Sequence, residues 1–376
     1  MKPIYLDYAA TTPVDLRVVE AMQSCLSLEG VFGNPSSSHL FGQAARVRID
    51  LAREQVACLI GALPSEIVWT SGATESNNLA LKGAAHLYRS RGKHIVTMKT
   101  EHKSVLDSCL QLEKEGYHVT YLTPESTGLL ALDKLKEALR DDTVLVSIMQ
   151  VNNETGVIQD MEAISNITAS QGILLHVDAV QAAGKIDIDV GRMPIDLLSL
   201  SAHKVYGPKG VGALYLRKKP RVRVAPLIQG GGHEQGMRSG TLPTHQIVGM
   251  GTAFELARQE MTSDALTIKR LRDHFLSALK PIKAIQLNVD LENGVPHILS
   301  LRFDGMLSQA ILQQLPGLAV STASACQGKG GEGSYVLRAL GFSEEQVKSA
   351  VRFSFGRFTT QADVDEAARW LVTLLA

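Results

Sequence analysis

Short apolar runs alternate with amphipathic segments from about residue 66 to residue 216, and this alternation most constrains the fold. The apolar runs predict buried strands, and the amphipathic segments predict helices. Strands that alternate with helices form a mostly parallel sheet covered on both faces. The chain is therefore predicted to be α/β, with ligands beyond the carboxyl ends of the strands. The predicted strands are 67–70, 94–98, 119–122, 144–149, 174–177 and 195–200, and the predicted helices are 75–88, 104–115, 132–140 and 161–170.

The composition changes after Gly251. A long amphipathic segment, 252–280, leads into shorter predicted strands and helices, which is typical of a smaller α+β domain. The chain has 376 residues, enough for about two domains. We expect a large domain of residues 15–258 and a small domain made of residues 1–14 and 259–376.

Charge and cysteine content exclude several classes of protein. Basic and acidic residues number 38 each, so no net field attracts a polyanion and direct nucleic-acid binding is not expected. The basic segment 217–223 is either a solvated connector or a docking surface for an acidic partner. The four cysteines form no CxxC pair, so neither a disulfide scaffold nor a metal site is expected. No signal peptide or membrane-spanning run is present in the sequence, so we expect a cytoplasmic protein.

Two polar groups follow predicted strands. Asp178 follows the strand 174–177, and Ser201-Ala202-His203-Lys204 follows the strand 195–200. A strand-end lysine alone is usually only solvated. Together with Asp178 it suits pyridoxal 5'-phosphate (PLP), because the lysine can form a Schiff base with the aldehyde and the carboxylate can pair with the pyridinium nitrogen. Ser201 and His203 can then hold the phosphate.

Other strand ends carry further candidates. The small residues 71–77 open a helix, either as a phosphate cradle or as an ordinary capped helix start. His102 either stacks on a planar ring and carries protons, or is structural. Asn153 and Gln181 either bind the phenolic oxygen of the cofactor or cap turns.

Cys326 lies in a stretch of small residues, 321–333, with four glycines within six residues. That composition predicts a mobile loop. The thiol on such a loop is either a nucleophile that reaches the substrate or an incidental surface group. Cys58, by contrast, lies in a helical apolar run and is expected in the core. Arg352, in the predicted strand 351–357, either binds a substrate carboxylate or forms a structural ion pair.

Motifs along almost the whole chain resemble those of the cysteine desulfurases, which are PLP enzymes of aminotransferase class V. The stretch after Cys326 resembles the branch typified by the NifS and IscS proteins. The chain ends at Ala376, before the longer tail that many such proteins carry, so docking of the usual iron–sulfur scaffold partner is not implied. The matching segments are 5–13, 33–37, 71–77, 101–103, 152–154, 176–179, 201–212, 230–245, 334–341 and 352–360.

The resemblance implies the PLP-dependent transferase fold of type I, with a mostly parallel sheet in the large domain and a smaller α+β domain that carries the cysteine loop. It also implies a homodimer, because Thr241 matches a phosphate ligand supplied by the other subunit. The implied catalytic residues are Cys326, Lys204 and His102; the implied cofactor ligands are Lys204, Ala73, Thr74, His102, Asn153, Asp178, Gln181, Ser201, His203 and Thr241; the implied substrate ligands are Asn34, Asn153 and Arg352.

The implied activity is the removal of sulfur from L-cysteine, which gives L-alanine and a persulfide on Cys326. An acceptor protein would then take the sulfur, and the segment 217–223 is a candidate for its docking site. One alternative is a selenocysteine lyase or another class V enzyme in which Cys326 is incidental. Another is a non-catalytic scaffold that kept the fold. Iron–sulfur assembly, tRNA thiolation and DNA sulfur modification all stay open as pathways.

Overall fold

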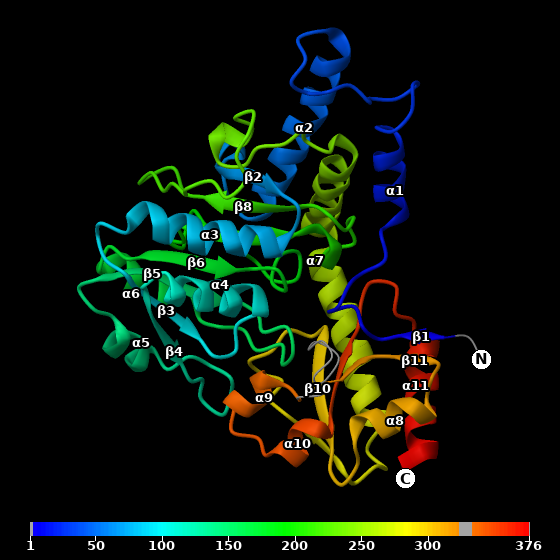
Figure 1. The fold of residues 1–376 in the computed structure, drawn as a ribbon. Coiled ribbons are helices and arrows are strands. Elements are labelled where there is room, and N and C mark those ends of the chain that lie inside the picture. The colour runs from blue at the N-terminus through cyan, green and yellow to red at the C-terminus, as the bar shows by residue number, and fades with distance from the viewer. Residues whose placement is uncertain (1–2, 323–332, 376) are drawn as a thin grey trace.

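A computed structural model describes residues 3–322 and 333–375. Its largest element is a seven-stranded sheet with the order β2-β8-β7-β6-β5-β3-β4 (Figure 1). The strands from β7 to β4 in that order run parallel, which confirms the mostly parallel α/β sheet. The strands are β2 (Ile67–Thr70), β3 (His94–Met98), β4 (His118–Leu122), β5 (Thr143–Met149), β6 (Leu174–Asp178), β7 (Leu197–Ser201) and β8 (Gly212–Leu216).

Strand β8 is the element of this sheet that the sequence did not predict. It runs antiparallel to both β7 and β2. All five of its residues are buried, as in most strands of this sheet, but no α-helix separates it from β7, so it falls outside the alternation of strands and helices on which the prediction rested. The connection from β7 is too short for the crossover that a parallel neighbour needs, so the chain must turn back.

Two groups of helices cover the two faces of the sheet. Alternate residues of β8 show the division, since Ala213 and Tyr215 pack in one core cluster and Leu214 and Leu216 in another. One cluster includes residues of α3 and α4, and the other includes residues of α2, α5, α6 and α7. The helices are α1 (Leu16–Gln23), α2 (Leu40–Leu59), α3 (Ala73–Tyr88), α4 (Lys103–Lys114), α5 (Leu132–Ala138), α6 (Met161–Ser170) and α7 (Thr244–Ala278), with short 3-10 helices η1 (Pro64–Glu66), η2 (Ala202–Lys204) and η3 (Glu234–Gly236).

Helix α7 begins eight residues before the predicted segment 252–280. The difference lies at Gly251, after which the change of composition suggested a boundary, and at the nearby Gly249. A Cβ on Gly251 would lie 2.6 Å from Cα of Ala52 in α2, and one on Gly249 would lie 2.8 Å from Met22. These glycines therefore permit close helix packing and do not end the helix.

The second part of the molecule is built on a four-stranded antiparallel sheet with the order β12-β13-β10-β9, beside the parallel pair β1-β11. Figure 1 shows α7 running from the large sheet to this second part. The predicted boundary between residues 258 and 259 therefore falls inside one continuous helix. The elements are β1 (Ile4–Tyr5), β9 (Ile285–Leu287), β10 (Ile298–Phe303), β11 (Leu318–Ala319), β12 (Ser321–Thr322), β13 (Ala350–Ser354), α8 (Ser308–Gln314), α9 (Tyr335–Ala339), α10 (Glu344–Lys348) and α11 (Gln361–Leu375).

Two predictions about the cysteines and their surroundings need correction. Ser321 and Thr322, expected at the start of the loop, pair with β13 as strand β12. Cys58, expected in the core, is exposed, because it falls on the outer side of α2 between the buried Ala57 and Leu59. Cys326 lies outside the described residues. Among the residues that are described, no helix has both the length and the apolar character needed to span a membrane.

Candidate active site

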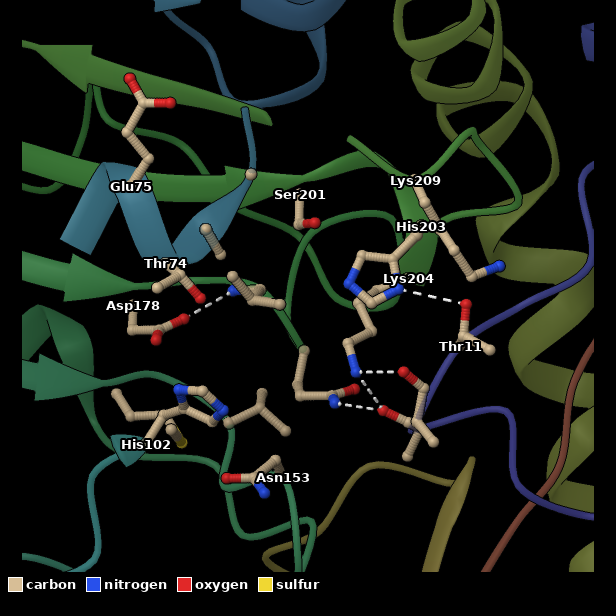
Figure 2. A pocket seen from close by; sticks show the side chains of 18 of the residues that line it. Thr11, Thr74, Glu75, His102, Asn153, Asp178, Ser201, His203, Lys204 and Lys209 are labelled. Carbon is tan, nitrogen blue, oxygen red and sulfur yellow. Dashed lines mark hydrogen bonds between the residues drawn. The ribbon is translucent and has the colours of Figure 1, made fainter. Parts of the chain in front are cut away.

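A cavity of about 600 Å³ lies at the carboxyl ends of β5, β6 and β7. Figure 2 shows Lys204, Asp178 and His102 around it, contributed by different elements. The first turn of α3 and the N-terminal segment 9–11 complete much of its wall. The predicted residues that line it are Ala73, Thr74, His102, Asn153, Asp178, Gln181, Ser201, His203, Lys204 and Arg352.

Lys204 is held by backbone carbonyl groups. It lies in η2, directly after β7, and its Nζ donates hydrogen bonds to the carbonyl oxygens of Ala9 and Ala10, each at 2.6 Å. Gln181 Nε2 donates to the same Ala9 oxygen at 2.8 Å. The N-terminal segment therefore positions the amine that the sequence predicted, although no role for that segment was predicted.

Asp178 ends β6 and is almost fully buried. Its Oδ1 accepts the backbone N–H of Val180 at 3.1 Å, and its Oδ2 accepts Asn77 Nδ2 at 2.8 Å. Glu101 lies close enough for the two carboxyl groups to interact, and burial, with Asp178 adding to it, raises the pKa of Glu101 well above its usual value. Two donors from different elements therefore hold the Asp178 carboxyl group in place.

His102 is the N-cap of α4, and its Nδ1 accepts the backbone N–H of Ser104 at 3.1 Å. Ser104 Oγ lies 2.8 Å from the same nitrogen. Burial lowers the pKa of His102, Asp178 opposes that shift, and Lys204 adds to it. The imidazole is therefore neutral near pH 7, and Nε2 carries its proton.

The first turn of α3 has the features of an anion site. Its N-cap is Gly72, which makes no side-chain capping bond, so the ordinary capped helix start is not what the structure shows. Gly72 has φ +148°, a backbone conformation that side chains rarely adopt. The helix N-terminus directs backbone N–H groups and positive potential at the cavity beside Ala73 and Thr74. Burial first, and then Lys204, lower the pKa of His203 to about 4, so this neighbour is a neutral donor at pH 7.

Arg352 is engaged in the ion pair that the sequence left open as an alternative. Its Nη2 donates to Asp7 Oδ1 at 2.8 Å and to Ser321 Oγ at 2.9 Å, and its Nη1 donates to the carbonyl oxygen of Asn153 at 2.7 Å. Three of the five N–H donors of the guanidinium are thereby used. Arg352 Nε and Asn153 Oδ1 are buried and have no partner within residues 3–322 and 333–375.

Two predicted ligands lie outside the cavity of their own chain. Asn34 is exposed, and its Oδ1 accepts the backbone N–H of Ser36. Thr241 is exposed too, and neither residue lines the cavity. His233 connects the two segments, because its Nε2 lies 3.2 Å from Ser36 Oγ and its Nδ1 accepts the backbone N–H of Gly240. Asn34 and Thr241 therefore belong to neighbouring loops on one face.

The cavity also contains residues that sequence reasoning missed. Thr11 Oγ1 lies 3.1 Å from His203 Nδ1, and Lys209 lines the same wall. Glu75, in the first turn of α3, accepts the backbone N–H of Ser71 and pairs with Arg238 at 2.9 Å. All of these residues lie in segments that matched the family, so position within a matched motif was the available signal.

Comparisons with known proteins agree with this geometry. The chain matches the aminotransferase class V family over residues 4–367. Cysteine desulfurase IscS of Aeromonas hydrophila subsp. hydrophila is 59% identical over 368 residues, covering 98% of this chain and 91% of that protein. A solved NifS-like protein superimposes with a TM-score of 0.93, 37% identity and 99% coverage of both chains. The structure of SspA in complex with cysteine has a TM-score of 0.83 and 39% identity, over 95% of this chain and 100% of that one. This chain belongs to the aminotransferase class V family.

Proposed function

We propose that this protein is a PLP-dependent cysteine desulfurase, which converts L-cysteine to L-alanine and keeps the sulfur as a persulfide. One observation carries the proposal: Lys204, Asp178 and His102 meet in one cavity of a chain that is 59% identical to a cysteine desulfurase. Members of this family depend on PLP. The structural neighbour solved with cysteine supports the choice of substrate.

The residues around the cavity fit this cofactor. Asp178 offers a buried carboxylate for the pyridinium nitrogen, and Lys204 offers the amine for the aldehyde. The uncapped start of α3, with Ser201 and His203, offers donors for the phosphate. When bound, PLP supplies an electron sink for the carbon that carries the substrate amino group.

The chain's own groups would divide the remaining work. Asn153 Oδ1 and Arg352 Nε are buried polar atoms that would gain partners from a bound amino acid. Neutral His102, with its proton on Nε2, is suited to exchange a proton at the cavity wall. The Lys204 amine would be suited to accept the proton of the substrate α-carbon.

Cys326 would accept the sulfur. Its thiolate would attack the substrate sulfur and form the S–S bond of the persulfide. The carbon–sulfur bond would break with its electron pair left on the β-carbon, and a proton from His102 or Lys204 would convert that carbon into the methyl group of L-alanine. The other cysteines are poor candidates. Cys25 and Cys109 are buried, and burial raises the pKa of Cys109 to about 12. Cys58 is exposed, so it is the informative control.

The test is mass spectrometry after brief exposure to L-cysteine, with alanine release measured in parallel. We expect a persulfide on Cys326 and none on the exposed Cys58. Cys326→Ser should bind PLP and cysteine but release almost no alanine, because a hydroxyl is a far poorer nucleophile toward sulfur. Near-normal alanine release by Cys326→Ser would favour another class V activity.

Borohydride reduction of the holoenzyme followed by peptide mapping tests the attachment of the cofactor. The pyridoxyl group should appear on Lys204 and not on Lys209, which lines the same cavity. A label on Lys209, or none, would refute the assignment. The unlabelled result would also favour the non-catalytic scaffold.

We propose further that the active protein is a homodimer in which Thr241 reaches the phosphate of the other subunit. Thr241 is exposed and does not line the cavity of its own chain, which supports this arrangement. An exposed apolar surface on α1, α2 and the segment between them also supports a large interface between the two subunits. The exposed apolar side chains there are Leu16, Leu26, Leu28, Phe32, Leu40, Phe41, Val47 and Leu51.

Mixed dimers test this proposal directly. A dimer of one Lys204→Ala chain and one Thr241→Ala chain regains one intact site if Thr241 acts across the interface. If Thr241 acts within its own chain, no intact site exists. We therefore expect half of the sites in mixed dimers to bind PLP with wild-type affinity, and none in either parent. Absence of such recovery in verified mixed dimers contradicts the proposal.

The acceptor protein would dock at the exposed part of the basic segment 217–223. Arg217 is not available, because its Nε donates to the carbonyl oxygen of Ile195. Lys219, Arg221 and Arg223 are exposed. We expect Arg223→Glu to slow persulfide transfer to an acidic acceptor without slowing alanine release, and the matched change at the exposed Lys283 to do neither. Equal transfer by both variants would remove this segment from the interface.

A further inference from the structure

Asn77 lies beneath the cavity wall and has no role in the proposed chemistry. It is fully buried in α3 and carries its amide between two groups of the site. Its Nδ2 donates to Asp178 Oδ2 at 2.8 Å and to Ser104 Oγ at 2.8 Å. Both amide hydrogens are therefore used by residues that lie on other elements.

The same bonds extend to His102. Because Ser104 Oγ accepts from Asn77, its own hydrogen is free to point to His102 Nδ1, 2.8 Å away. The backbone N–H of Ser104 points to the same nitrogen. A continuous path of hydrogen bonds thus joins Asp178 to His102, and every donor along it points away from Asn77.

The orientation of the Asn77 amide has only one good solution. The opposite orientation would place its oxygen against the Asp178 carboxylate, where two acceptors repel each other. In the observed orientation Oδ1 is buried and unpartnered within the described parts of the chain. An unpartnered buried oxygen costs stability. The residue is therefore poorly explained as a packing element and better explained by the two bonds that its nitrogen makes.

We propose that Asn77 is a positioning residue that fixes the Asp178 carboxylate toward the cofactor and, through Ser104, fixes the tautomer of His102. The inference rests on the proposed cofactor site, and it extends that site to a residue that never touches the ligand. One amide sets both the partner of the cofactor ring and the histidine beside it.

The pH behaviour of His102 depends on several charged groups around it. Asp178 faces it from β6, Lys204 from η2 and Asp107 from its own helix. Loss of Asn77 removes a donor from Asp178 and one from Ser104. Both losses favour the imidazolium, because the carboxylate is less neutralised and the Ser104 hydroxyl can turn to accept a proton from Nδ1.

The test compares Asn77→Ala, Ser104→Ala and a matched control in the PLP-loaded full-length protein. Asn78→Ala is the control, since Asn78 is the neighbouring amide and bonds only to the carbonyl oxygen of Thr74 within the described chain. Imidazole ¹⁵N signals, assigned to His102 with a His102→Gln variant, report its tautomer and its titration midpoint. Dialysis with absorbance reports the dissociation constant of PLP.

We expect the His102 titration to move to higher pH in both Asn77→Ala and Ser104→Ala. The PLP dissociation constant should rise about tenfold in Asn77→Ala alone, because only that variant removes a hydrogen bond to the charged Asp178. Asn78→Ala should leave both readouts unchanged. Ser104→Ala keeps the Asn77 side chain, so it tests the path even if Asn77→Ala does not fold.

An unchanged His102 titration in Ser104→Ala would overturn the path, and unchanged PLP binding in a folded Asn77→Ala would overturn the role toward Asp178. A similar change in Asn78→Ala would reduce the effect to a general disturbance of α3. None of these readouts involves the turnover of cysteine. They therefore stand or fall separately from the desulfurase activity.

Discussion

Buried polar groups within the strands of the large sheet differ from those at its carboxyl edge. His176, in β6, has a hydroxyl on each ring nitrogen: Ser147 Oγ lies 2.8 Å from Nδ1 and Ser199 Oγ lies 2.9 Å from Nε2. His94, at the start of β3, likewise has Thr143 and Thr120 on its two nitrogens. These histidines are fully satisfied by the protein and are structural.

At the carboxyl edge, the buried polar groups are only partly satisfied. Asn77 Oδ1, Glu101 Oε2, Asn153 Oδ1 and Arg352 Nε have no partner among the residues described. Each such atom costs about 1–3 kcal/mol when buried. Asn153 and Arg352 line the cavity, where a bound ligand would supply the missing partners of these two atoms. Unpartnered buried atoms also occur away from the cavity, at Trp69, Asn288 and Trp370, so a missing partner marks the site only where the residue also lines the cavity.

The largest expected effect comes from removing the amine at the edge. Lys204→Ala should lower alanine formation by roughly 10⁴-fold or more, because the covalent attachment of PLP and a base are both lost. The fold should persist, since the hydrogen bonds that Lys204 Nζ donates to Ala9 and Ala10 go to backbone carbonyl oxygens and not to other side chains. Alanine release and circular dichroism measure the two quantities. Alanine formation within tenfold of the wild-type rate would show that Lys204 is not essential to the site.

His102→Gln should lower kcat by roughly 10³-fold, within the range for a lost general acid or base. Its free energy of unfolding should fall by only about 1 kcal/mol, because His102 also caps α4. His176→Gln is the matched change within a strand, and its kcat should stay close to that of wild type. Equal losses of kcat in His102→Gln and His176→Gln would show that His102 contributes no more to catalysis than a buried histidine within a strand.

Much of the scaffold could be predicted because the parallel strands are short apolar runs separated by helices with clear periodicity. The positions of Lys204 and Asp178 at the carboxyl ends of strands could be predicted for the same reason, since each belongs to or follows such a run. Strand β8 could not, because no α-helix separates it from β7 and the prediction rested on strands that alternate with helices. The start of α7 was missed because Gly251 permits close packing against Ala52, which only the three-dimensional structure reveals.

The rest of the site depends on contacts that local sequence does not encode. The carbonyl groups that hold Lys204 belong to the backbone, so they place no demand on residue type that a pattern could reveal. The Asp7–Arg352 ion pair joins residues 345 positions apart. Asn77 was visible as part of a motif, but its role depends on Ser104 and Asp178 from two other elements.

The next expected effect concerns stability. His176→Ala should lower the free energy of unfolding by about 3 kcal/mol, because it leaves a cavity and removes a partner from both Ser147 and Ser199. Chemical denaturation of the PLP-free and PLP-bound protein measures the loss. The kcat of the folded variant should change little. A stable variant with low kcat would mean that His176 contributes to the site after all.

The smallest expected effect is a pH dependence that originates in the same buried histidine. Burial lowers the pKa of His176 from 6.5 to about 3. Between these two values the unfolded chain binds a proton at this position and the folded chain does not, so the stability due to neutral His176 is fully present above pH 6.5 and is lost as the pH falls. At pH 5.5, one unit below the unfolded value, the loss is about 1.4 kcal/mol.

His176→Gln cannot titrate, so its free energy of unfolding should fall by about 1.4 kcal/mol less than that of wild type between pH 7.5 and pH 5.5. Comparing the two proteins is essential, since burial also lowers the pKa of His94 and His203. If the free energy of unfolding depends on pH in the same way in wild type and His176→Gln, His176 is not held neutral in the folded protein. The buried histidines of the strands would then not differ from the site in their protonation.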